Sequence, residues 1–340
     1  MTAAQILNIS ENDPERLFNI KEFTYQSKKL KSQWFPDRNT DPQSNTVFVH
    51  ISTMIKVATR RIETKTWNGP NSISFTTDDY RDFNLTYSKI YDMEFGKMYI
   101  GKTIICYVFT EDNKDLYQNG LAMIKKLKYR NKEFEKQFKQ YFPKIRFSSK
   151  TNIGYVVVMD KPKGAALLQD VIDIQPNNTI IPKQTAWIVG AMYNISVFLD
   201  SINIVHNAIL PNTVFIDPIT HMVMLYGGWW YARPTDSKMT ALPSKLISIL
   251  PNEVIVNKKA KSIYDRLAIK ATGIGCLGDP SLIGSKLLMN KDIPKLMLLW
   301  LRSPSTNSAL EEYEGWYTTL QKCFGKRKFV KMDFDINKLY

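Results

Sequence analysis

The chain has 340 residues, which is long enough for two or three domains. Its apolar fraction of 44%, with 12% aromatic residues, excludes a disordered chain, and its longest apolar run, at residues 296–301, is too short to span a bilayer. The 46 basic and 32 acidic residues give a net charge of +14, which is unevenly spread along the chain.

Residues 1–67 are predicted to form three helices. The pattern favours a short helix at residues 3–10, a second at residues 19–34 and a third at residues 45–62. Apolar residues fall near one face of the second helix at Ile20, Phe23, Leu30 and Trp34. Pro36 ends that helix, because proline lacks an N–H group and its ring clashes with the preceding turn.

The loop between the second and third helices reads Phe35-Pro36-Asp37-Arg38-Asn39-Thr40-Asp41-Pro42. It resembles the His-Pro-Asp loop, with the following Arg-Asn-x-Asp-Pro, of J-domains, the co-chaperone modules that stimulate DnaK-type chaperones. The third helix has matching residues at Phe48, Ile51, Ile55 and Val57. The resemblance implies a J-like three-helix domain at residues 1–67. The alternative is a generic helical hairpin with a polar proline turn.

One departure from the J-domain pattern bears on function. The family histidine, which stimulation of the chaperone ATPase requires, is replaced by Phe35. The resemblance therefore implies that stimulation is lost while a docking surface remains, and a DnaK-type chaperone is at most a weak partner. The residues of that implied partner surface are Lys28, Lys29, Lys31, Phe35, Pro36 and Asp37.

Residues 68–89 are predicted to connect this domain to the next, since Trp67-Asn68-Gly69-Pro70-Asn71 is a turn signal. A β-rich region follows at residues 90–160, and its central buried strand has two alternative positions. Residues 102–109 are favoured over residues 122–127, because they are β-branched and aromatic, whereas residues 115–128 have helical spacing.

Residues 121–150 hold ten Lys and Arg residues against two acidic ones, Glu133 and Glu135. A stretch of this charge is a candidate surface for nucleic acid or for an acidic protein. The other interpretation is a solvated helical face.

The next elements lead to the most informative stretch of the chain. Residues 153–159 form a continuous apolar run, which predicts a buried strand, and residues 182–201 carry an apolar stripe typical of a long core helix. Residues 201–230 then predict a helix end, a tight loop, two short strands and a loop at Gly227-Gly228.

Residues 201–230 resemble the catalytic and metal-binding loops of protein kinases, whose pattern is His-Arg-Asp, Leu-Lys-Pro-x-Asn, two strands and Asp-Phe-Gly. His206, Pro211 and Gly228 match it. Four residues of the kinase pattern are replaced. Ala208 replaces the catalytic Asp, Leu210 the Lys, Thr213 the metal-binding Asn, and Tyr226 the Asp of Asp-Phe-Gly. Phosphoryl transfer depends on positioning and on Mg²⁺ held by carboxylate and amide oxygens. The resemblance therefore implies a kinase-like fold without the activity.

The resemblance also assigns supporting residues. Residues 160–164 look like the kinase hinge, and Glu253 like the glutamate of the Ala-Pro-Glu element. Asp265 matches the buried aspartate that accepts hydrogen bonds from the catalytic loop. His206, Glu253 and Asp265 are thus expected to be structural.

The ion pair of the kinase small lobe is implied to be absent. With residues 102–109 as its third strand, the nucleotide-binding lysine falls at Cys106 or Tyr107. Its glutamate partner falls near Asn119 or Gly120.

The sequence thus predicts an α+β chain with a J-like helical domain at residues 1–67, a connection at 68–89, and a bilobal kinase-like fold with a small lobe at 90–160 and a large lobe at 161–340. The predicted function is that of an inactive pseudokinase that binds or scaffolds a protein partner, without cofactor or metal. One alternative is an atypical active kinase or nucleotide-binding switch, with Lys125, His206, Asp217 and Asp236 as candidates. Another is a nucleic-acid-binding protein that uses the basic stretch.

The predicted setting is a reducing cytoplasm, because Cys106, Cys276 and Cys323 are scattered, odd in number and not spaced as metal ligands. Residues 1–15 lack the basic start of a secretory signal, and no membrane association is expected. Bacterial viruses with large genomes encode divergent J-domain and kinase-like proteins, so the resemblance is consistent with a phage protein in its host's cytoplasm.

Overall fold

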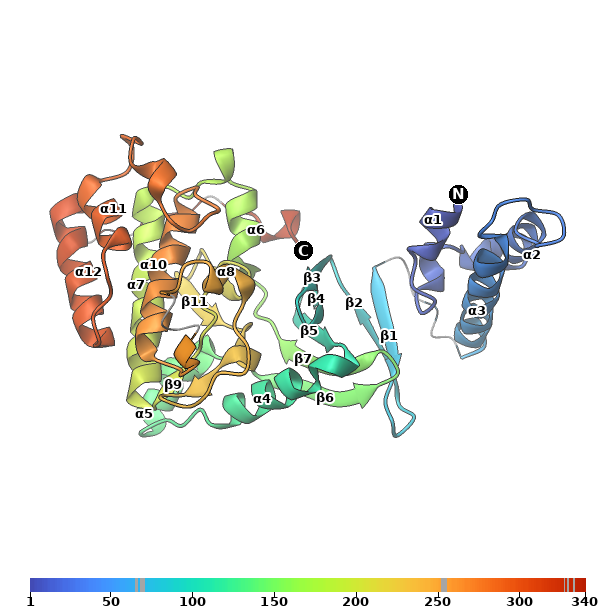
Figure 1. The fold of residues 1–340 in the computed structure, drawn as a ribbon, viewed down its shortest axis with the longest axis horizontal. Helices are drawn as coiled ribbons and strands as arrows, with labels where there is room; N and C mark the ends of the chain where they lie inside the picture. The colour runs from blue at the N-terminus through green and yellow to red at the C-terminus, as the bar shows by residue number, and fades with distance from the viewer. Residues whose placement is uncertain (65–66, 68–70, 252–255, 327, 329, 333) are drawn as a thin grey trace.

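The computed structural model describes residues 1–64, 67, 71–251, 256–326, 328, 330–332 and 334–340. Figure 1 shows, in chain order, a group of N-terminal helices, a β-rich lobe and a mainly helical lobe. The two lobes share one continuous hydrophobic core, whereas the N-terminal helices bury a core of their own. This architecture confirms the predicted mixture of helices and sheets.

The N-terminal part consists of α1 (Ala3–Leu7), α2 (Phe23–Gln33) and α3 (Ser44–Glu63). The second helix begins later than predicted, because residues 20–22 form a 3-10 turn (η2, Ile20–Glu22), and Ile20 is 47% exposed. The face of α3 in this core consists of Val47, Ile51, Met54 and Ala58, while Phe48, Ile55 and Val57 lie half-buried at its flanks.

The region predicted as a connection contains a β-hairpin. Strand β1 (Ser72–Thr76) pairs antiparallel with β2 (Asp82–Thr86). Ile73 and Phe75 alternate with polar residues and pack against the outer face of the neighbouring sheet. The alternation extends over only five residues, too few to distinguish a strand from a polar loop by pattern alone.

The β-rich lobe is built on five antiparallel strands in the order β3-β4-β5-β7-β6. They are β3 (Lys89–Met93), β4 (Gly96–Ile100), β5 (Ile104–Phe109), β6 (Ile145–Thr151) and β7 (Gly154–Asp160). Between β5 and β6 the chain forms α4 (Lys114–Lys125) and α5 (Lys132–Phe138). The central strand thus has the register that the β-branched pattern favoured, and residues 122–127 belong to a helix and its end.

The helical lobe surrounds two long buried helices, α7 (Pro182–Ser201) and α10 (Ser262–Cys276), which pack against each other. Its other helices are α6 (Leu168–Asp173), α8 (Ser244–Ile247), α11 (Lys295–Arg302) and α12 (Ala309–Phe324). Small sheets join β8 (Ala166–Leu167) to β10 (Val214–Asp217) and β11 (Met222–Leu225), and β9 (Ile204–Val205) to β12 (Arg233–Pro234). Among the described residues, no helix has both the length and the apolar character needed to cross a membrane.

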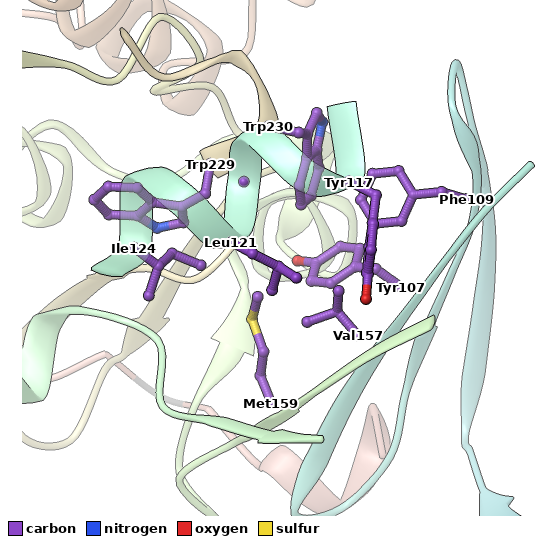
Figure 2. Close-up of a pocket in the computed structure, with 10 residues that line it drawn as sticks. Tyr107, Phe109, Tyr117, Leu121, Ile124, Val157, Met159, Trp229 and Trp230 are labelled. Carbon is purple, nitrogen blue, oxygen red and sulfur yellow. The ribbon is translucent and has the colours of Figure 1, made fainter. Parts of the chain in front are cut away.

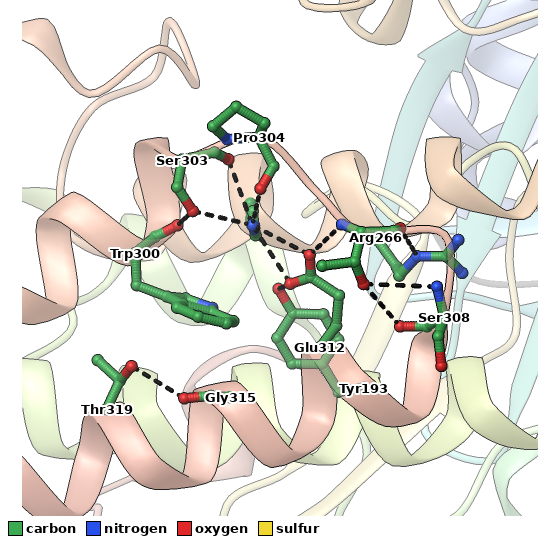
Figure 3. Close-up of polar contacts among 11 residues, drawn as sticks. Tyr193, Arg266, Trp300, Ser303, Pro304, Ser308, Glu312, Gly315 and Thr319 are labelled. Carbon is green, nitrogen blue, oxygen red and sulfur yellow. Dashed lines mark hydrogen bonds and ion pairs between the residues drawn. The ribbon is translucent and has the colours of Figure 1, made fainter.

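A buried ion pair joins α10 to α12 (Figure 3). Lys270 and Glu312 lie 3.2 Å apart, with side chains 2% and 0% exposed. Lys270 also donates to the carbonyl of Pro304 at 2.9 Å, and Glu312 accepts from the backbone N–H of Thr306 at 2.6 Å. Both charges therefore have hydrogen-bonding partners in the core, which burial of a charge requires.

Candidate nucleotide cleft

A buried carboxylate on α10 fixes the loop that corresponds to the kinase catalytic loop. Asp265 is 2% exposed, and its two oxygens accept from the backbone N–H groups of His206 and Asn207, each at 2.7 Å. Burial raises the pKa of Asp265 to about 7, although the two donors act in the opposite direction. The backbone support expected at this position is therefore present in the geometry.

Three side chains of this loop, those of Ala208, Leu210 and Thr213, provide neither a titratable group nor a free oxygen ligand. Ala208 and Leu210 are apolar and fully buried. The Thr213 hydroxyl donates to the carbonyl of Ala208 and accepts from the N–H of Leu210 at 3.1 Å, so it closes the loop on itself. Burial lowers the pKa of His206 to about 3, so its ring is neutral at physiological pH and serves packing.

The sequence resemblance to kinases leads us to expect Tyr226 at the position of the metal-binding Asp. Its side chain is buried, its hydroxyl donates to the carbonyl of Gln140 at 3.4 Å, and burial raises its pKa to about 12. A neutral phenol is a poor ligand for Mg²⁺, which prefers anionic oxygens. Within the described ranges, no group of three or more His, Cys, Asp or Glu side chains is arranged to hold a metal ion.

Trp230 packs between β5 and α4 (Figure 2). Its ring centroid lies 4.7 Å from that of Tyr107 on β5. On the other side, a Cβ atom placed on Gly120 of α4 would lie 3.4 Å from the Trp230 backbone nitrogen. Gly120 thus packs closely against Trp230, and neither Tyr107 nor Gly120 contributes a charge to this space.

Further rings close the space around Trp230. Phe95, from the turn between β3 and β4, lies 4.4 Å from the Trp230 ring, and Phe109 lies 5.4 Å from it. The cavity that Tyr107, Gly120 and Trp230 line encloses about 10 Å³, the room for about one water molecule. Small-molecule sites typically measure about 300–1,000 Å³, so this internal cavity under α4 is not itself a small-molecule site.

The structure distinguishes Cys106 from Tyr107, the two positions predicted for the lost lysine. Cys106 packs on the outer face of the sheet, with Ile73 and Phe75 of the hairpin, so it does not face the cleft. Successive strand residues point to opposite faces, and Tyr107 therefore faces α4 and Trp230. On α4, Gly120 faces Trp230, while the neighbouring Asn119 donates to the carbonyl of Trp230 at 2.8 Å. Trp230 could not be predicted as part of this site, because it lies two residues beyond Gly228, the last residue that matches the kinase pattern.

The remaining candidates for an atypical kinase are not brought together. Lys125 is exposed at the end of α4, and Asp236 is exposed and ion-paired with Lys261. Asp217 accepts from the backbone N–H of Ile219 at 3.0 Å and so caps the turn between β10 and β11. Glu253 lies outside the described residues.

The surface predicted from the J-domain resemblance is exposed. Lys28, Lys29 and Lys31 of α2 are solvent-accessible, as are Phe35 and Asp37, while Pro36 is half-buried. The Phe35 ring is 40% exposed and rests edge-on against Phe48 of α3, with ring centroids 5.6 Å apart. Basic and aromatic groups thus lie together near the α2–α3 loop.

The basic stretch at residues 121–150 is partly neutralised. Four of its ten cations form ion pairs, namely Lys139, Lys144, Arg146 and Lys150. The other six are exposed at the end of α4, in the following loop and on α5. Binding of an anionic partner to these six exposed cations stays a prediction.

Comparison with known proteins identifies the fold. No protein-family model matches the sequence, and no curated protein matches it. A solved structure of vaccinia related kinase 3 is similar, with a TM-score of 0.50 and 12% sequence identity, over 76% of this chain and 93% of that chain. At this identity the likeness shows the fold alone, which is kinase-like as the sequence predicted.

Proposed function

We propose that the protein is a pseudokinase, a kinase-like fold that binds or scaffolds a protein partner and does not transfer phosphate. The observation that carries this proposal is the position of Trp230, between Tyr107 and Gly120. In an active kinase a lysine and a glutamate meet there and hold the nucleotide phosphates. Here Tyr107 and Gly120 carry no charge, and Trp230 packs against both of them.

The other replacements support the same proposal. Ala208 has no group that accepts a proton, Thr213 is engaged with the backbone of its own loop, and Tyr226 is a neutral buried phenol. By contrast, Asp265 keeps its two bonds to the catalytic-loop backbone. Groups that support the fold persist where the groups that perform chemistry do not. This pattern favours a binding role over the alternative of an atypical kinase.

The purified chain is expected to transfer no phosphate. Incubation with radiolabelled ATP and Mg²⁺ or Mn²⁺ should label neither the protein nor generic substrates, because a single positioned base already contributes about 10²–10⁴-fold to the rate. Asp236→Asn and Lys125→Ala are the diagnostic variants, because both residues are candidates for an atypical kinase and both are exposed, so that their replacement spares the core. Robust transfer that either variant abolishes would favour the atypical kinase.

We further propose that the α2–α3 loop region is a second docking surface, for an acidic protein. The support is the exposure of Lys28, Lys29 and Lys31 beside the accessible Phe35 ring. Phe35 stands where J-domains have their histidine, so the purified chain is not expected to accelerate a DnaK-type ATPase. Phe35→His alone should not restore full stimulation, because Lys31 and Ser32 also depart from apolar family positions.

Reversing both charges in Lys28→Glu/Lys29→Glu is expected to weaken binding of the acidic partner by about twofold to thirtyfold, since exposed charge contacts are worth about 0.2–1 kcal/mol each. Quantitative pull-down from host lysate at two salt concentrations measures this, because salt weakens such contacts. Lys286→Glu/Lys291→Glu is the matched control, with the same charge change on exposed residues of the large lobe. If both double variants recover the same amount of the acidic partner, the basic face of α2 is solvent-exposed without a role in binding.

A further inference from the structure

The segment Phe334–Tyr340 returns from the large lobe to the junction of the two lobes, and in Figure 1 it ends beside α6 and β3. It contains a 3-10 turn, η8 (Ile336–Lys338), followed by Leu339 and Tyr340. Both of these side chains are buried, at 6% and 8% exposure. A segment that buries its last two side chains is docked on the fold.

The phenol of Tyr340 enters a polar site formed by Lys161, Leu167 and Asp170, which is called the seat below. Its hydroxyl donates to the carboxylate of Asp170 on α6 and accepts from the backbone N–H of Leu167 at 3.0 Å. The ammonium group of Lys161, which follows β7 and is itself 4% exposed, lies 4.7 Å from the centre of the Tyr340 ring. The hydroxyl is thus used both as donor and as acceptor, and the ring contacts a largely desolvated cation.

Asp170 of the seat also binds residues of the small lobe. Asp170 is 2% exposed, and its Oδ1 atom accepts from the Lys89 ammonium group at 2.8 Å and from the hydroxyl of Tyr91. Both residues belong to β3, the edge strand of the small-lobe sheet. Oδ2 of the same carboxylate accepts from Tyr340. One buried carboxylate thus joins β3, α6 and the segment Phe334–Tyr340.

We propose that this seat is a peptide-binding site between the lobes, which holds the segment Phe334–Tyr340 in cis through the phenol of Tyr340 and so locks β3 against α6. Without Tyr340, Oδ2 of Asp170 is left buried without this donor, which weakens the whole junction. A peptide partner of the site would carry an aliphatic residue followed by tyrosine. This inference is independent of whether the cleft binds nucleotide.

The first test removes a single oxygen atom. In the full chain, Tyr340→Phe keeps the ring and deletes the hydroxyl, and amide hydrogen exchange in β3 and α6 should become about tenfold faster. Tyr317→Phe, on the exposed face of α12 at 45% exposure, is the matched control and should leave both elements unchanged. Unchanged exchange in the Tyr340→Phe variant would overturn the proposal, and so would an acceleration spread evenly over the whole chain.

The second test supplies the segment in trans. The receptor is the full chain with Leu339→Ala/Tyr340→Ala, which opens the seat without truncation. An amidated peptide of residues 334–340 should bind it, slow exchange in β3 and α6, and bind the unaltered chain at least about tenfold more weakly because the cis segment competes. A peptide ending in phenylalanine should bind about tenfold less well. Equal binding of the two peptides, or no protection by either, would overturn the proposal.

Discussion

Replacing Glu312 with alanine is expected to lower the free energy of unfolding by about 3–5 kcal/mol, since removal of one partner of a buried pair leaves the other charge uncompensated. The partner is Lys270, which is 2% exposed and would keep only its bonds near Ser303 and Pro304. Glu312 also accepts from Thr306 and from the Tyr193 hydroxyl, so three donors lose their acceptor at once.

Denaturant unfolding of the purified chain measures this loss. Glu314→Ala is the matched control, because Glu314 lies on the same helix, α12, and is exposed. We expect it to change stability by less than about 0.5 kcal/mol. A Glu312→Ala variant as stable as this control would show that the pair shown in Figure 3 does not hold α10 to α12.

Replacing Trp230 with alanine is expected to cost about 3–5 kcal/mol, because a fully buried aromatic side chain leaves a cavity behind. The indole is 2% exposed and contacts the rings of Phe95, Tyr107 and Phe109. The loss should appear in the same denaturant experiment, and Trp230→Phe, which keeps part of the ring contacts, should lose clearly less.

The Trp230→Ala variant also tests whether the packing of Trp230 alone prevents nucleotide binding. Trp230→Ala opens space between β5 and α4, yet on the proposed function Ala208 and Tyr226 still stand at the positions of the catalytic and metal-binding residues. We therefore expect it to bind no Mg-ATP despite the larger cavity. A variant that loses stability and gains Mg-dependent nucleotide binding would mean that Trp230 alone closes an otherwise competent site.

Local sequence patterns predicted the parts of the fold that depend on local chemistry. The β-branched run of β5 and the stripe of α7 were placed from residue spacing, since period-2 and period-3.6 patterns reflect which face is buried. The position of Asp265 followed from the resemblance to kinases, and its bonds to His206 and Asn207 are those expected there.

The parts that depend on distant contacts were not predictable. The β1–β2 hairpin is stabilised by burial of Ile73 and Phe75 on a sheet whose strands begin later in the chain, and no local signal encodes that contact. In the sequence, Trp230 is an aromatic residue shortly after a glycine pair, and nothing marks it as special. Only the fold shows that it packs against Gly120, which lies 110 residues earlier in the chain. Likewise, the sequence gives no sign that Tyr340 meets Asp170.

The central claim is the proposal that the kinase-like fold binds no Mg-ATP, and a thermal shift scan with millimolar ATP and Mg²⁺ tests it most directly. A ligand at 100 times its Kd stabilises the folded state by about 2.7 kcal/mol, which would raise the Tm by about 5–10 °C in a domain of this size. We predict no rise beyond that seen with Mg²⁺ alone. A rise of several degrees that requires both ATP and Mg²⁺, and that EDTA removes, would contradict the account.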